Sequence, residues 1–472
     1  MKKRLLLFFL FTILFFGRSY AQFAYFKELK PLQVTTNTKD KPQSKVWNYA
    51  GKYWTVLTDS SGTFVWRLDD LTWKRSLQIS TSTYGKADCK VVGNVTHVLI
   101  FKKTSTYLIS VEYDEELQDY KLWSVRTARA PIALDSGAET ATIDIDTRGR
   151  MWLASDDTTN VLSCNINVRW SDYPYASWSA SITLASGVTH DDLGALIAMP
   201  TAGKVAVLWS DQNSKRFGFR THNDEDDPEH WSEDEVPASE SAFDIGGGMA
   251  DDHMNMAVSS DGTLYCAVKT SYDDPEYPRL ALLIRRPNGH WDPVYDVTRS
   301  GTRPIVLLNE DIGTIKIVYT TVENGGNIIY RESPMADIKF SAPYTLLVGK
   351  YNYATSMKQN FSSNVVILAS DSIHVVGVLA TDKKDKSMEL YAYPNPFREK
   401  TSVNFSLTET QEYALELYDF KGSKVAVLQQ GIARAHEPYL YDLPGTLLAD
   451  GLYIVRLRTS KQSKILRLIQ TR

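Results

Sequence analysis

Short apolar or alternating runs, each cut by Gly, Asp, Asn or Pro, repeat along most of the chain. The segment from Asp252 to Thr298 shows the unit clearly, because four such runs are separated there by SSDGT, YDDPEYP and PNGH. Runs of this length between turn residues predict an antiparallel four-stranded meander. An aromatic residue opens the last predicted strand of the unit.

These aromatic residues recur at a regular spacing of 49 to 60 residues. A fixed period of this length is typical of a repeat architecture. Six units fit between Ser44 and Leu347, and a seventh begins at Ala354 but lacks its fourth strand. The opening residues are Trp73, Trp123, Trp178, Trp231, Trp291 and Phe340.

The missing strand has a counterpart near the N-terminus, where Ala24–Val34 shares the aromatic, proline and apolar pattern of the segment that starts at Phe340. We therefore expect an all-β chain in which residues 22–381 form a seven-bladed β-propeller of four-stranded blades. The N-terminal strand would close the last blade beside Ile373–Ala380 and so remove the exposed sheet edge. Two stacked β-sandwiches are the alternative, but they would not produce one period over this length.

The N-terminus has the three parts of a secretory signal peptide. The basic segment Lys2–Arg4 precedes the apolar run Leu5–Phe16, and the small residues Ser19 and Ala21 precede the expected cleavage point. We expect residues 1–21 to be removed on export. The run is too short to span a bilayer, and no other stretch of that length lacks charges, so we expect no transmembrane segment.

A different module follows the repeats. Residues 382–390 begin with Asp-Lys-Lys-Asp-Lys and have no apolar periodicity, which predicts a charged linker. Residues 391–472 contain short alternating runs with Gly422 and Gly451 at turns, which predicts a small Ig-like β-sandwich.

Several spaced motifs make this module similar to the C-terminal sorting domain of the type IX secretion system of Bacteroidetes. They are Tyr393–Phe397 (YPNPF), Leu417–Gly422, Leu448–Tyr453 and the basic end Lys464–Leu468. The resemblance covers under a fifth of the chain. It implies handling by the type IX secretion machinery, passage through the outer membrane, removal of the tail, and release or attachment at the cell surface. The expected sorting residues are Tyr393, Pro394, Asn395, Pro396, Gly422 and Gly451.

Charge and cysteine content narrow the possible partners and chemistry. Lys and Arg total 52 against 56 Asp and Glu, so no overall field favours nucleic acid or an anionic membrane. Cys89, Cys164 and Cys266 are an odd set within apolar runs, which favours buried thiols over a disulfide framework.

In a propeller the starts of the innermost strands surround one mouth of the channel, where ligands usually bind. Acids, bases and two histidines are predicted there, and they offer hydrogen bonds to sugar hydroxyls, pairing with a carboxylate, or proton transfer. The adjacent loops around Arg303 are also long, and nearby tyrosines are suited to stacking on sugar rings. The simpler interpretation is that these residues are polar only because the channel rim is exposed to solvent. The candidate ligand-binding residues are Lys45, Glu139, His190, Asp191, Asp252, Tyr272, Tyr277, Tyr351 and Tyr353.

We expect a secreted or surface-attached protein that recognises a glycan or polysaccharide at this mouth. The enzyme alternative is a polysaccharide lyase or glycoside hydrolase acting on an acidic polysaccharide, with His253, Arg303 and Lys358 as candidate catalytic residues. Protein–protein adhesion through the broad propeller face is a third hypothesis.

Enzyme motifs give little support for catalysis. The sequence has no Gly-x-Ser-x-Gly elbow, no His-Glu-x-x-His helix and no phosphate-binding glycine loop. Ser259–Tyr265 (SSDGTLY) is similar to the Asp box of sialidase-like secreted propellers, although Gly262 stands one place early and the segment falls between predicted strands 1 and 2. The resemblance implies three arginines at the site, and only Arg303 is well placed.

No metal or cofactor is required by any motif. An Asp follows the second predicted strand in four repeats, and this recurrence favours a turn cap over calcium ligation, with calcium as the minor alternative. These residues are Asp59, Asp156, Asp211 and Asp371.

Overall fold

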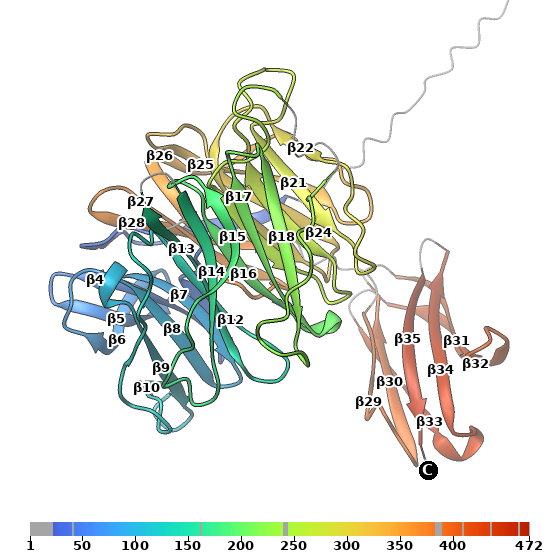
Figure 1. The fold of residues 1–472 in the computed structure, drawn as a ribbon. Coiled ribbons are helices and arrows are strands. Elements are labelled where there is room, and N and C mark those ends of the chain that lie inside the picture. Colours follow the sequence, from blue (N-terminus) through green and yellow to red (C-terminus); the bar gives the residue numbers. More distant parts are fainter. Residues whose placement is uncertain are drawn as a thin grey trace, which may run out of the picture. The chain divides into compact units, whose positions relative to one another are not determined.

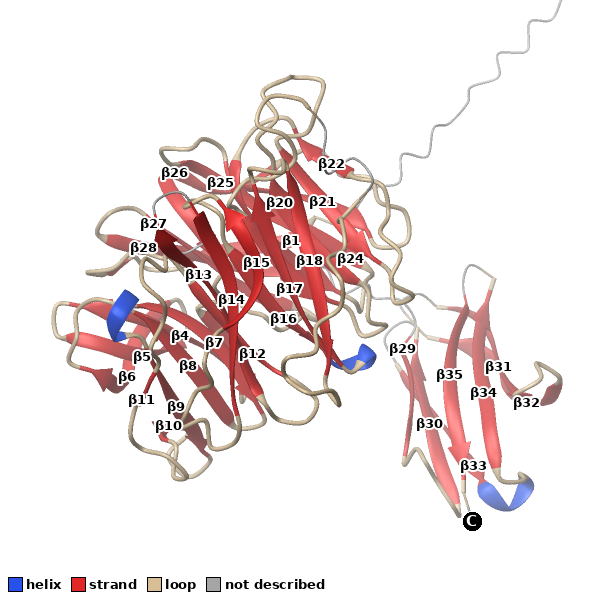
Figure 2. Cartoon of the chain, viewed as in Figure 1, coloured by secondary structure: helices blue, strands red, loops and turns tan. Residues whose placement is uncertain are grey.

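The computed structural model describes residues 22–39, 42–160, 163–238, 244–382, 389–407, 410–434, 437–460 and 463–471. Strands make up 58% of the chain and helices 2%, so the protein is all-β, as predicted (Figures 1 and 2). It divides into two compact units, Met1–Asp382 and Lys383–Arg472. The expected signal peptide and residues 383–388 of the expected linker lie outside the described residues.

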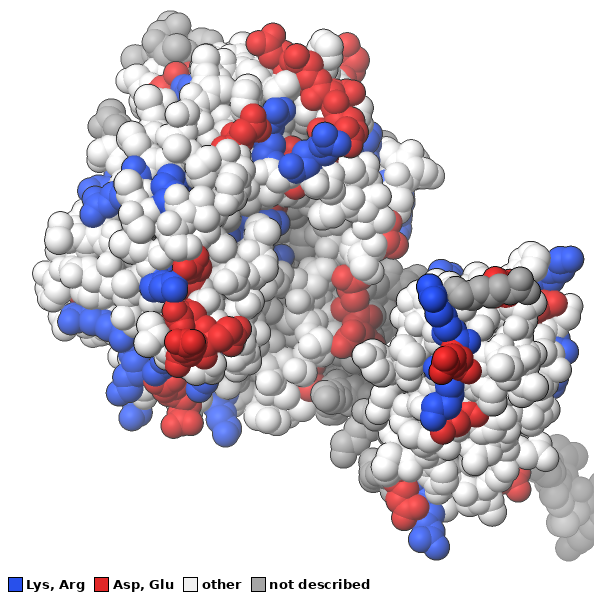
Figure 3. All heavy atoms as spheres, turned by 90° about the horizontal axis from the view of Figure 1, so that it is seen from below, with Lys and Arg blue, Asp and Glu red and all other residues white. Residues whose placement is uncertain are grey.

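Among the described residues, no helix has the length and apolarity needed to cross a membrane. On the face shown in Figure 3, the Lys and Arg side chains are interspersed with Asp and Glu in both units.

The first unit consists of antiparallel sheets that follow one another in chain order around a common centre, a propeller-like arrangement (Figure 1). Three of the sheets have four strands each. They are β3 (Val46–Tyr49), β4 (Lys52–Asp59), β5 (Gly62–Asp69) and β6 (Thr72–Ser80); β12 (Ala141–Ile145), β13 (Met151–Asn160), β14 (Ser163–Ser171) and β15 (Ile182–Val188); and β19 (Met254–Val258), β20 (Leu264–Lys269), β21 (Leu280–Arg285) and β22 (Tyr295–Thr298).

Two further sheets depart from this pattern. The sheet of β7 to β11 has a short fifth strand beside β9, and the sheet of β16 to β18 has three strands. The first consists of β7 (Lys86–Val92), β8 (Val95–Phe101), β9 (Tyr107–Asp114), β10 (Asp119–Leu122) and β11 (Ala130–Pro131). The second consists of β16 (Gly194–Met199), β17 (Lys204–Asp211) and β18 (Arg216–Asn223), and the short 3-10 helices are η1 (Lys103–Ser105) and η2 (Pro200–Ala202).

The last part of the unit is one larger sheet, because the long strand β26 pairs with β25 at its start and with β27 at its end. Its other edge holds the N-terminal strand, where Phe23 lies opposite Asp382 and Glu28 lies opposite Val378. The predicted pairing of the N-terminal segment with Ile373–Ala380 is therefore confirmed. The strands are β23 (Thr302–Asn309), β24 (Thr314–Thr320), β25 (Gly326–Pro334), β26 (Tyr344–Thr355), β27 (Asn364–Ser370), β28 (His374–Asp382), β1 (Phe23–Glu28) and β2 (Leu32–Gln33).

The prediction that a repeated aromatic residue opens the last strand of each unit is wrong for several units. Trp73 lies inside β6, but Trp178, Trp291 and Phe340 each precede their strand by four residues. In these units and in the one with Trp231, the residue after the aromatic one already forms a backbone hydrogen bond with the third strand. The N–H groups of Ser179, Ser232, Asp292 and Ser341 donate to the carbonyls of Trp170, Thr221, Ile284 and Glu332 at 2.8–2.9 Å.

The serine at this position also accepts a hydrogen bond in return. The Ser179, Ser232 and Ser341 hydroxyl oxygens accept the third-strand N–H groups at 3.0, 2.9 and 3.2 Å. A side-chain oxygen thus replaces a strand carbonyl for one residue, so the chain can bend after the aromatic residue without leaving a buried N–H unsatisfied.

Apolar side chains pack between neighbouring sheets rather than in one central core. Trp47 and Trp54, for example, are buried against the next sheet, where Trp47 Nε1 donates to the Tyr120 hydroxyl at 2.9 Å. The rings of Trp54 and Tyr120 meet edge to face, with centroids 4.7 Å apart. The three cysteines are free and buried, which confirms the sequence interpretation.

The innermost strands of neighbouring sheets are joined by side chains. Asp88 of β7 accepts the N–H groups of Ser44 and Ile143, each at 2.8 Å. Asp144 of β12 accepts the N–H of Ala198 at 2.9 Å. Carboxylates thus satisfy backbone donors that have no strand partner on that side.

The second unit is a sandwich of two sheets. One is β29 (Glu389–Tyr393), β30 (Lys400–Ser406) and β33 (Pro438–Pro444); the other is β32 (Lys424–Ala433), β31 (Gln411–Asp419), β34 (Gly451–Thr459) and β35 (Ser463–Gln470), with the 3-10 helix η3 (Gly445–Leu447) between β33 and β34. Their facing side chains share one apolar core, which includes Val403, Phe405, Leu415 and Val455.

A buried ion cluster lies where β1 and β28 meet β24 and β25. Lys316 Nζ is 3.0 Å from Glu332 Oε2 and 3.0 Å from Asp382 Oδ1, and these side chains are 0–1% exposed. Asn309 Nδ2 donates to Asp382 Oδ2 at 2.9 Å, and Lys316 Nζ lies 4.7 Å from the centre of the Phe23 ring. The cluster therefore connects the closing strands to the neighbouring sheet.

Removing the cation should destabilise the first unit strongly, because two carboxylates would remain buried without it. Lys316→Met is expected to lower the free energy of unfolding by about 3–5 kcal/mol. All 11 Trp residues lie between Trp47 and Trp291, so urea unfolding followed by Trp fluorescence reports this unit alone. Glu225→Gln, which breaks the exposed pair with Arg148, is the control and should change stability by under about 1 kcal/mol. Equal effects of the two substitutions would contradict the prediction.

Candidate functional site

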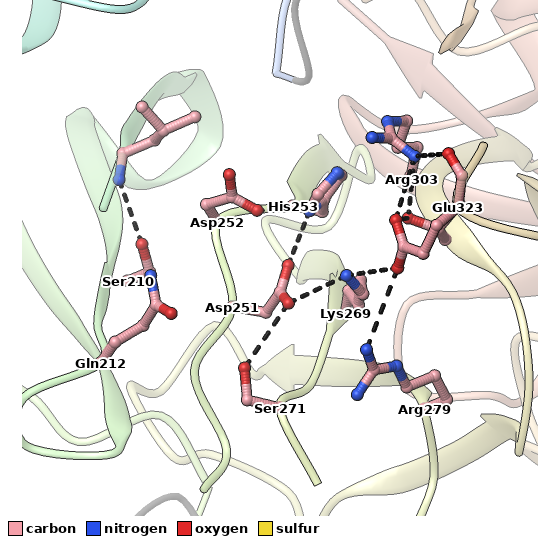
Figure 4. A network of polar contacts seen from close by, with 12 residues as sticks. Ser210, Gln212, Asp251, Asp252, His253, Lys269, Ser271, Arg279, Arg303 and Glu323 are labelled. Atoms are coloured by element: carbon pink, nitrogen blue, oxygen red, sulfur yellow. Dashed lines mark hydrogen bonds and ion pairs between the residues drawn. The ribbon is translucent and has the colours of Figure 1, made fainter. Parts of the chain in front are cut away.

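A chain of ion pairs runs from the interior to the surface beside β19, β20 and β23 (Figure 4). Asp251 Oδ1 lies 2.6 Å from His253 Nδ1, and the other oxygen of Asp251 lies 3.1 Å from Lys269 Nζ. Lys269 in turn lies 2.6 Å from Glu323 Oε1. Asp252 also contacts His253 Nδ1. We call these residues, together with Arg303, the Glu323 network.

The Glu323 network becomes more exposed towards its outer end. The side chains of His253 and Lys269 are 6% and 7% exposed, whereas that of Glu323 is 46% exposed. Burial opposes ionisation of Asp251, but the hydrogen bond with His253 and the nearby Lys269 outweigh it and lower the pKa of this carboxyl. Burial also opposes ionisation of Glu323, and Lys269 again lowers the pKa. Both carboxylates are therefore charged at neutral pH.

Arg303 holds the outer end of the network. Its Nη1 donates to the Glu323 carbonyl at 2.9 Å and to Glu323 Oε2 at 3.2 Å. Its guanidinium carbon lies 4.9 Å from the centre of the Tyr353 ring, within cation–π range. Arg303 and Tyr353 both have positive φ, 55° and 57°, a costly backbone conformation that recurs at functional sites.

Glu323 separates two surface pockets. The first has a volume of about 490 Å³ and is lined by Arg303, Tyr353, Lys350 and Asn37 among others. The second has a volume of about 510 Å³, and its lining includes Tyr272, Tyr277, Arg279 and Arg299. We call them the Tyr353 pocket and the Tyr277 pocket. Each combines an aromatic ring with charged hydrogen-bonding groups, a lining suited to sugar rings and their hydroxyls.

The structure brings several predicted site residues together. Asp252, His253 and Arg303 belong to the Glu323 network, and Tyr353 and Tyr277 line the two pockets. Tyr272 is 4% exposed; its hydroxyl donates to Met249 Sδ at 3.3 Å, and its ring lies 5.2 Å from that of Tyr277. Tyr277 is thus the more accessible ring of the pair.

Tyr351 and the acidic loop residues lie elsewhere. Tyr351 packs against the apolar core beneath β26. Glu139 is exposed, and its backbone N–H donates to Asp156 at 2.8 Å. His190 and Asp191 are exposed on the loop before β16, where their side chains lie 3.7 Å apart.

Both predicted lysines are structural. Lys358 follows β26, and its Nζ pairs with Asp88 Oδ2 at 2.6 Å. Lys45 is 1% exposed, and its Nζ donates to Gln43 Oε1 at 3.0 Å and to the Ala87 carbonyl at 3.2 Å. Arg303 and Lys358 are therefore bound to different partners, and buried Lys45 has no access to a ligand.

Sequence reasoning missed Lys269 and Glu323. Lys269 ends an otherwise apolar strand, and no spacing rule relates it to Asp251. Glu323 lies in the loop after β24, and the length of that loop was the only available signal. Charge-pair networks of this kind form between residues that are distant in sequence, so a single sequence does not reveal them.

Asp251, Asp252 and His253 form one group of potential metal ligands among the described residues, since each offers a ligand atom within 4.8 Å of the others. The Lys269 ammonium already supplies a positive charge to Asp251, so we assign no metal to this group.

The repeated Asp residues mostly cap turns, as predicted. Asp59, Asp211 and Asp371 accept N–H groups of the following residues at 2.7–2.9 Å. Asp156 differs, because it accepts the N–H groups of Glu139 and Thr140, and burial raises its pKa to about 7.

The tail has a second site candidate, where its first motif meets its last strand. Asn395 Nδ2 donates to the Arg467 carbonyl at 2.8 Å, and Asn395 Oδ1 accepts the N–H of Ile469 at 2.9 Å. Phe397 is buried and continues this pairing with β35, whereas Tyr393 is 79% exposed. The two ends of the motif series thus form one folded unit.

The predicted glycines of the tail lie where L side chains are disfavoured. Gly422 has φ of 83° in the turn after β31, and Gly451 has φ of 150° at the start of β34. Both conformations are available mainly to glycine.

The fold defines an all-β protein with a propeller-like first unit and a separate tail. Residues 391–471 match the family described as a secretion system C-terminal sorting domain. The protein is therefore exported by type IX secretion to the extracellular space or the cell surface.

Comparison with solved structures includes a protein of unknown function from Dyadobacter fermentans, at 11% identity and a TM-score of 0.46, covering 76% of this chain and 99% of that chain. The polysaccharide lyase Uly1 is 9% identical with a TM-score of 0.41, covering 72% and 90%. A mutant Trypanosoma rangeli sialidase displaying trans-sialidase activity is 8% identical with a TM-score of 0.41, covering 93% and 88%. We draw no functional conclusion from similarities at this level. No curated protein matches the chain in sequence.

Asp251→Asn should destabilise the first unit by about 1.5–3 kcal/mol, because it removes a charged partner of Lys269 and His253. The folded-state pKa of Asp251 is lowered, so its contribution is complete above the unfolded value of about 3.9 and is lost as the pH falls through the folded value. The contribution of the Asp251 carboxylate should thus be complete at about pH 5 and shrink below about pH 4. Urea unfolding measured by Trp fluorescence tests this, with the exposed Asp273→Asn as control. A stability difference from wild type that already shrinks at pH 6 would contradict it.

Asn395→Ala should reduce export, because it removes the two side-chain hydrogen bonds between Asn395 and β35. The expected loss of local stability is about 1–3 kcal/mol. Immunoblots of medium, cell surface and periplasm should show several-fold less exported protein and its retention in the periplasm. Asn404→Ala, in which the lost side-chain bond spans two residues within β30, is the control and should export normally. Normal export of the Asn395 variant would refute the coupling.

Proposed function

We propose that the first unit is a seven-bladed propeller whose last strand, β28, ends at Asp382, that the second unit, which begins with β29 at Glu389, is an Ig-like sandwich, and that residues 1–21 are a signal peptide. The predicted linker of residues 382–390 overlaps β28 and β29 at its two ends. The contacts among the innermost strands support the blade count. The strands β3, β7, β12, β16, β19, β23 and β26 contact one another in this order. The ring returns to its start where the Val46 N–H donates to the Ser356 carbonyl at 3.4 Å.

We propose that the exported propeller recognises a glycan or polysaccharide with the Tyr353 and Tyr277 pockets. The observation that carries the proposal is the shared wall, because Glu323 lines both pockets and is itself held by Lys269, Thr302 and Arg303. Neighbouring pockets with a fixed charged divider suit consecutive units of a chain-like ligand. A preorganised wall also loses little conformational entropy when the ligand binds.

A depolymerising enzyme is the second candidate. The contact of His253 with Asp251 favours it, since a carboxylate bound to Nδ1 orients a histidine for proton transfer. Burial of His253 and its second carboxylate contact argue against it, and His253 lines neither pocket. Recognition without catalysis is therefore the better-supported function.

Tyr277→Ala and Lys350→Ala should each weaken glycan binding about tenfold, because a stacking surface or a charged hydrogen-bond donor is lost. Binding of the tail-bearing protein is measured on a glycan array and then by titration with the strongest ligand. Tyr173→Ala, at a tyrosine 62% exposed and outside both pockets, is the matched control and should bind like wild type. Unchanged binding in both pocket variants, or product release from the bound polysaccharide, would overturn recognition as the function.

A further inference from the structure

A third pocket lies over the junction of β22 with β25 and the segment that precedes β26. Its volume is about 440 Å³, and its lining includes Tyr295, Asp296, Arg299, Arg331 and Lys339. Phe340, one of the repeated aromatic residues, also lines it. We call it the outer pocket. Neither the fold nor the Glu323 network accounts for the basic residues gathered there.

The outer pocket has an excess of positive charge. Asp296 is its one acidic lining residue, and it pairs with Arg299 at 2.6 Å. Arg331 Nη1 donates a hydrogen bond to the Ser341 carbonyl at 3.1 Å. Lys339 is exposed and has no acidic partner within ion-pair distance among the described residues. Two positive charges are therefore left without a counter-charge in the pocket.

Arg331 also has an unused hydrogen-bond donor. Its Nε is buried and has no acceptor in the part of the chain that the structure describes. Because this atom has almost no exposed surface, a ligand in the outer pocket would contact Arg331 through the more exposed atoms of its side chain. Planar guanidinium groups favour carboxylate and sulfate oxygens, because two N–H groups can bind one oxyanion.

The outer pocket adjoins the proposed glycan site. Arg299 lines both the outer pocket and the Tyr277 pocket, and Glu323 joins the Tyr277 pocket to the Tyr353 pocket. Each pocket therefore shares a lining residue with the next one in the order outer pocket, Tyr277 pocket, Tyr353 pocket. Basic residues outnumber acidic ones in the lining of the outer pocket, whereas they do not in the other two pockets.

We propose that Arg299, Arg331 and Lys339 form an outer subsite that binds a sulfate or carboxylate group of an acidic polysaccharide. The polysaccharide part rests on the proposed function, but oxyanion binding by the pocket does not. Arg331 and Arg299 would bind the oxyanion through their N–H groups, and Lys339 would add charge at the rim. The ligand class is thus narrowed from glycans in general to a polymer bearing acidic groups.

The test compares the wild-type protein with Arg331→Gln and Lys339→Gln, using dextran sulfate, carboxymethyl dextran and neutral dextran as probes in titrations at one ionic strength. Each variant should bind the two acidic polymers about five- to tenfold more weakly than wild type, with neutral dextran unaffected. Arg148→Gln removes an equal charge at an exposed turn outside the outer pocket and should bind like wild type. The polymer with the larger loss identifies sulfate or carboxylate as the preferred group.

The outcomes separate this subsite from the proposed function. Unchanged binding of acidic polymers in both variants, or an equal loss in Arg148→Gln, would overturn the subsite and leave glycan recognition intact. If no saccharide binds at all, a thermal shift with sodium sulfate against sodium chloride at equal ionic strength isolates the pocket. A larger sulfate shift in wild type than in both variants would support the subsite while recognition fails, and equal shifts would overturn it.

Discussion

The free edges of the innermost strands are the constraint on which the first unit depends. Apart from β26, each such strand pairs on one side only, so the N–H groups of Ile143 and Ala198 face the neighbouring sheet without a strand partner. Asp88 and Asp144 accept them, and the cost of leaving buried donors unpaired explains why carboxylates occupy an interior position. These charges require cations. Lys358 pairs with Asp88, Lys90 with Asp144, and against the effect of burial both lysines lower the pKa of Asp144.

Buried carboxylates also need a cation where the first and last strands of the first unit pair. Strand β1 completes the sheet edge at β28, and Asp382, at the end of β28, is buried against Lys316 and Asn309. Closure therefore combines backbone pairing with a buried charge cluster. Pairing satisfies the edge, and the cluster favours one register, because sliding β28 by one residue would move Asp382 away from its cation. The chain then leaves the first unit at a residue that is firmly held.

The sequence was sufficient for the strand pattern but not for the roles of the polar residues. Apolar runs and turn residues predicted the sheets and the pairing of the N-terminal strand, because side-chain burial and glycine conformation act locally. The offset between Trp178 and β15 was missed, since it depends on the Ser179 hydroxyl bonding across the sheet. Lys358 and Arg303 were equivalent candidates in the sequence. Only three-dimensional contacts separate Lys358, which pairs with Asp88 between strands, from Arg303, which contacts Glu323.

That separation also explains the character of the proposed site. A surface carboxylate usually samples many orientations, yet Glu323 is fixed by Lys269 and Arg303, and Lys269 is fixed from within by Asp251. The buried end of the network thus positions the exposed end, so Glu323 forms a fixed wall between the two pockets. Binding in such pockets needs little rearrangement. Proton transfer by His253 would instead require its ring to be released from two carboxylates, so the network that makes Glu323 a good divider makes His253 a poor catalyst.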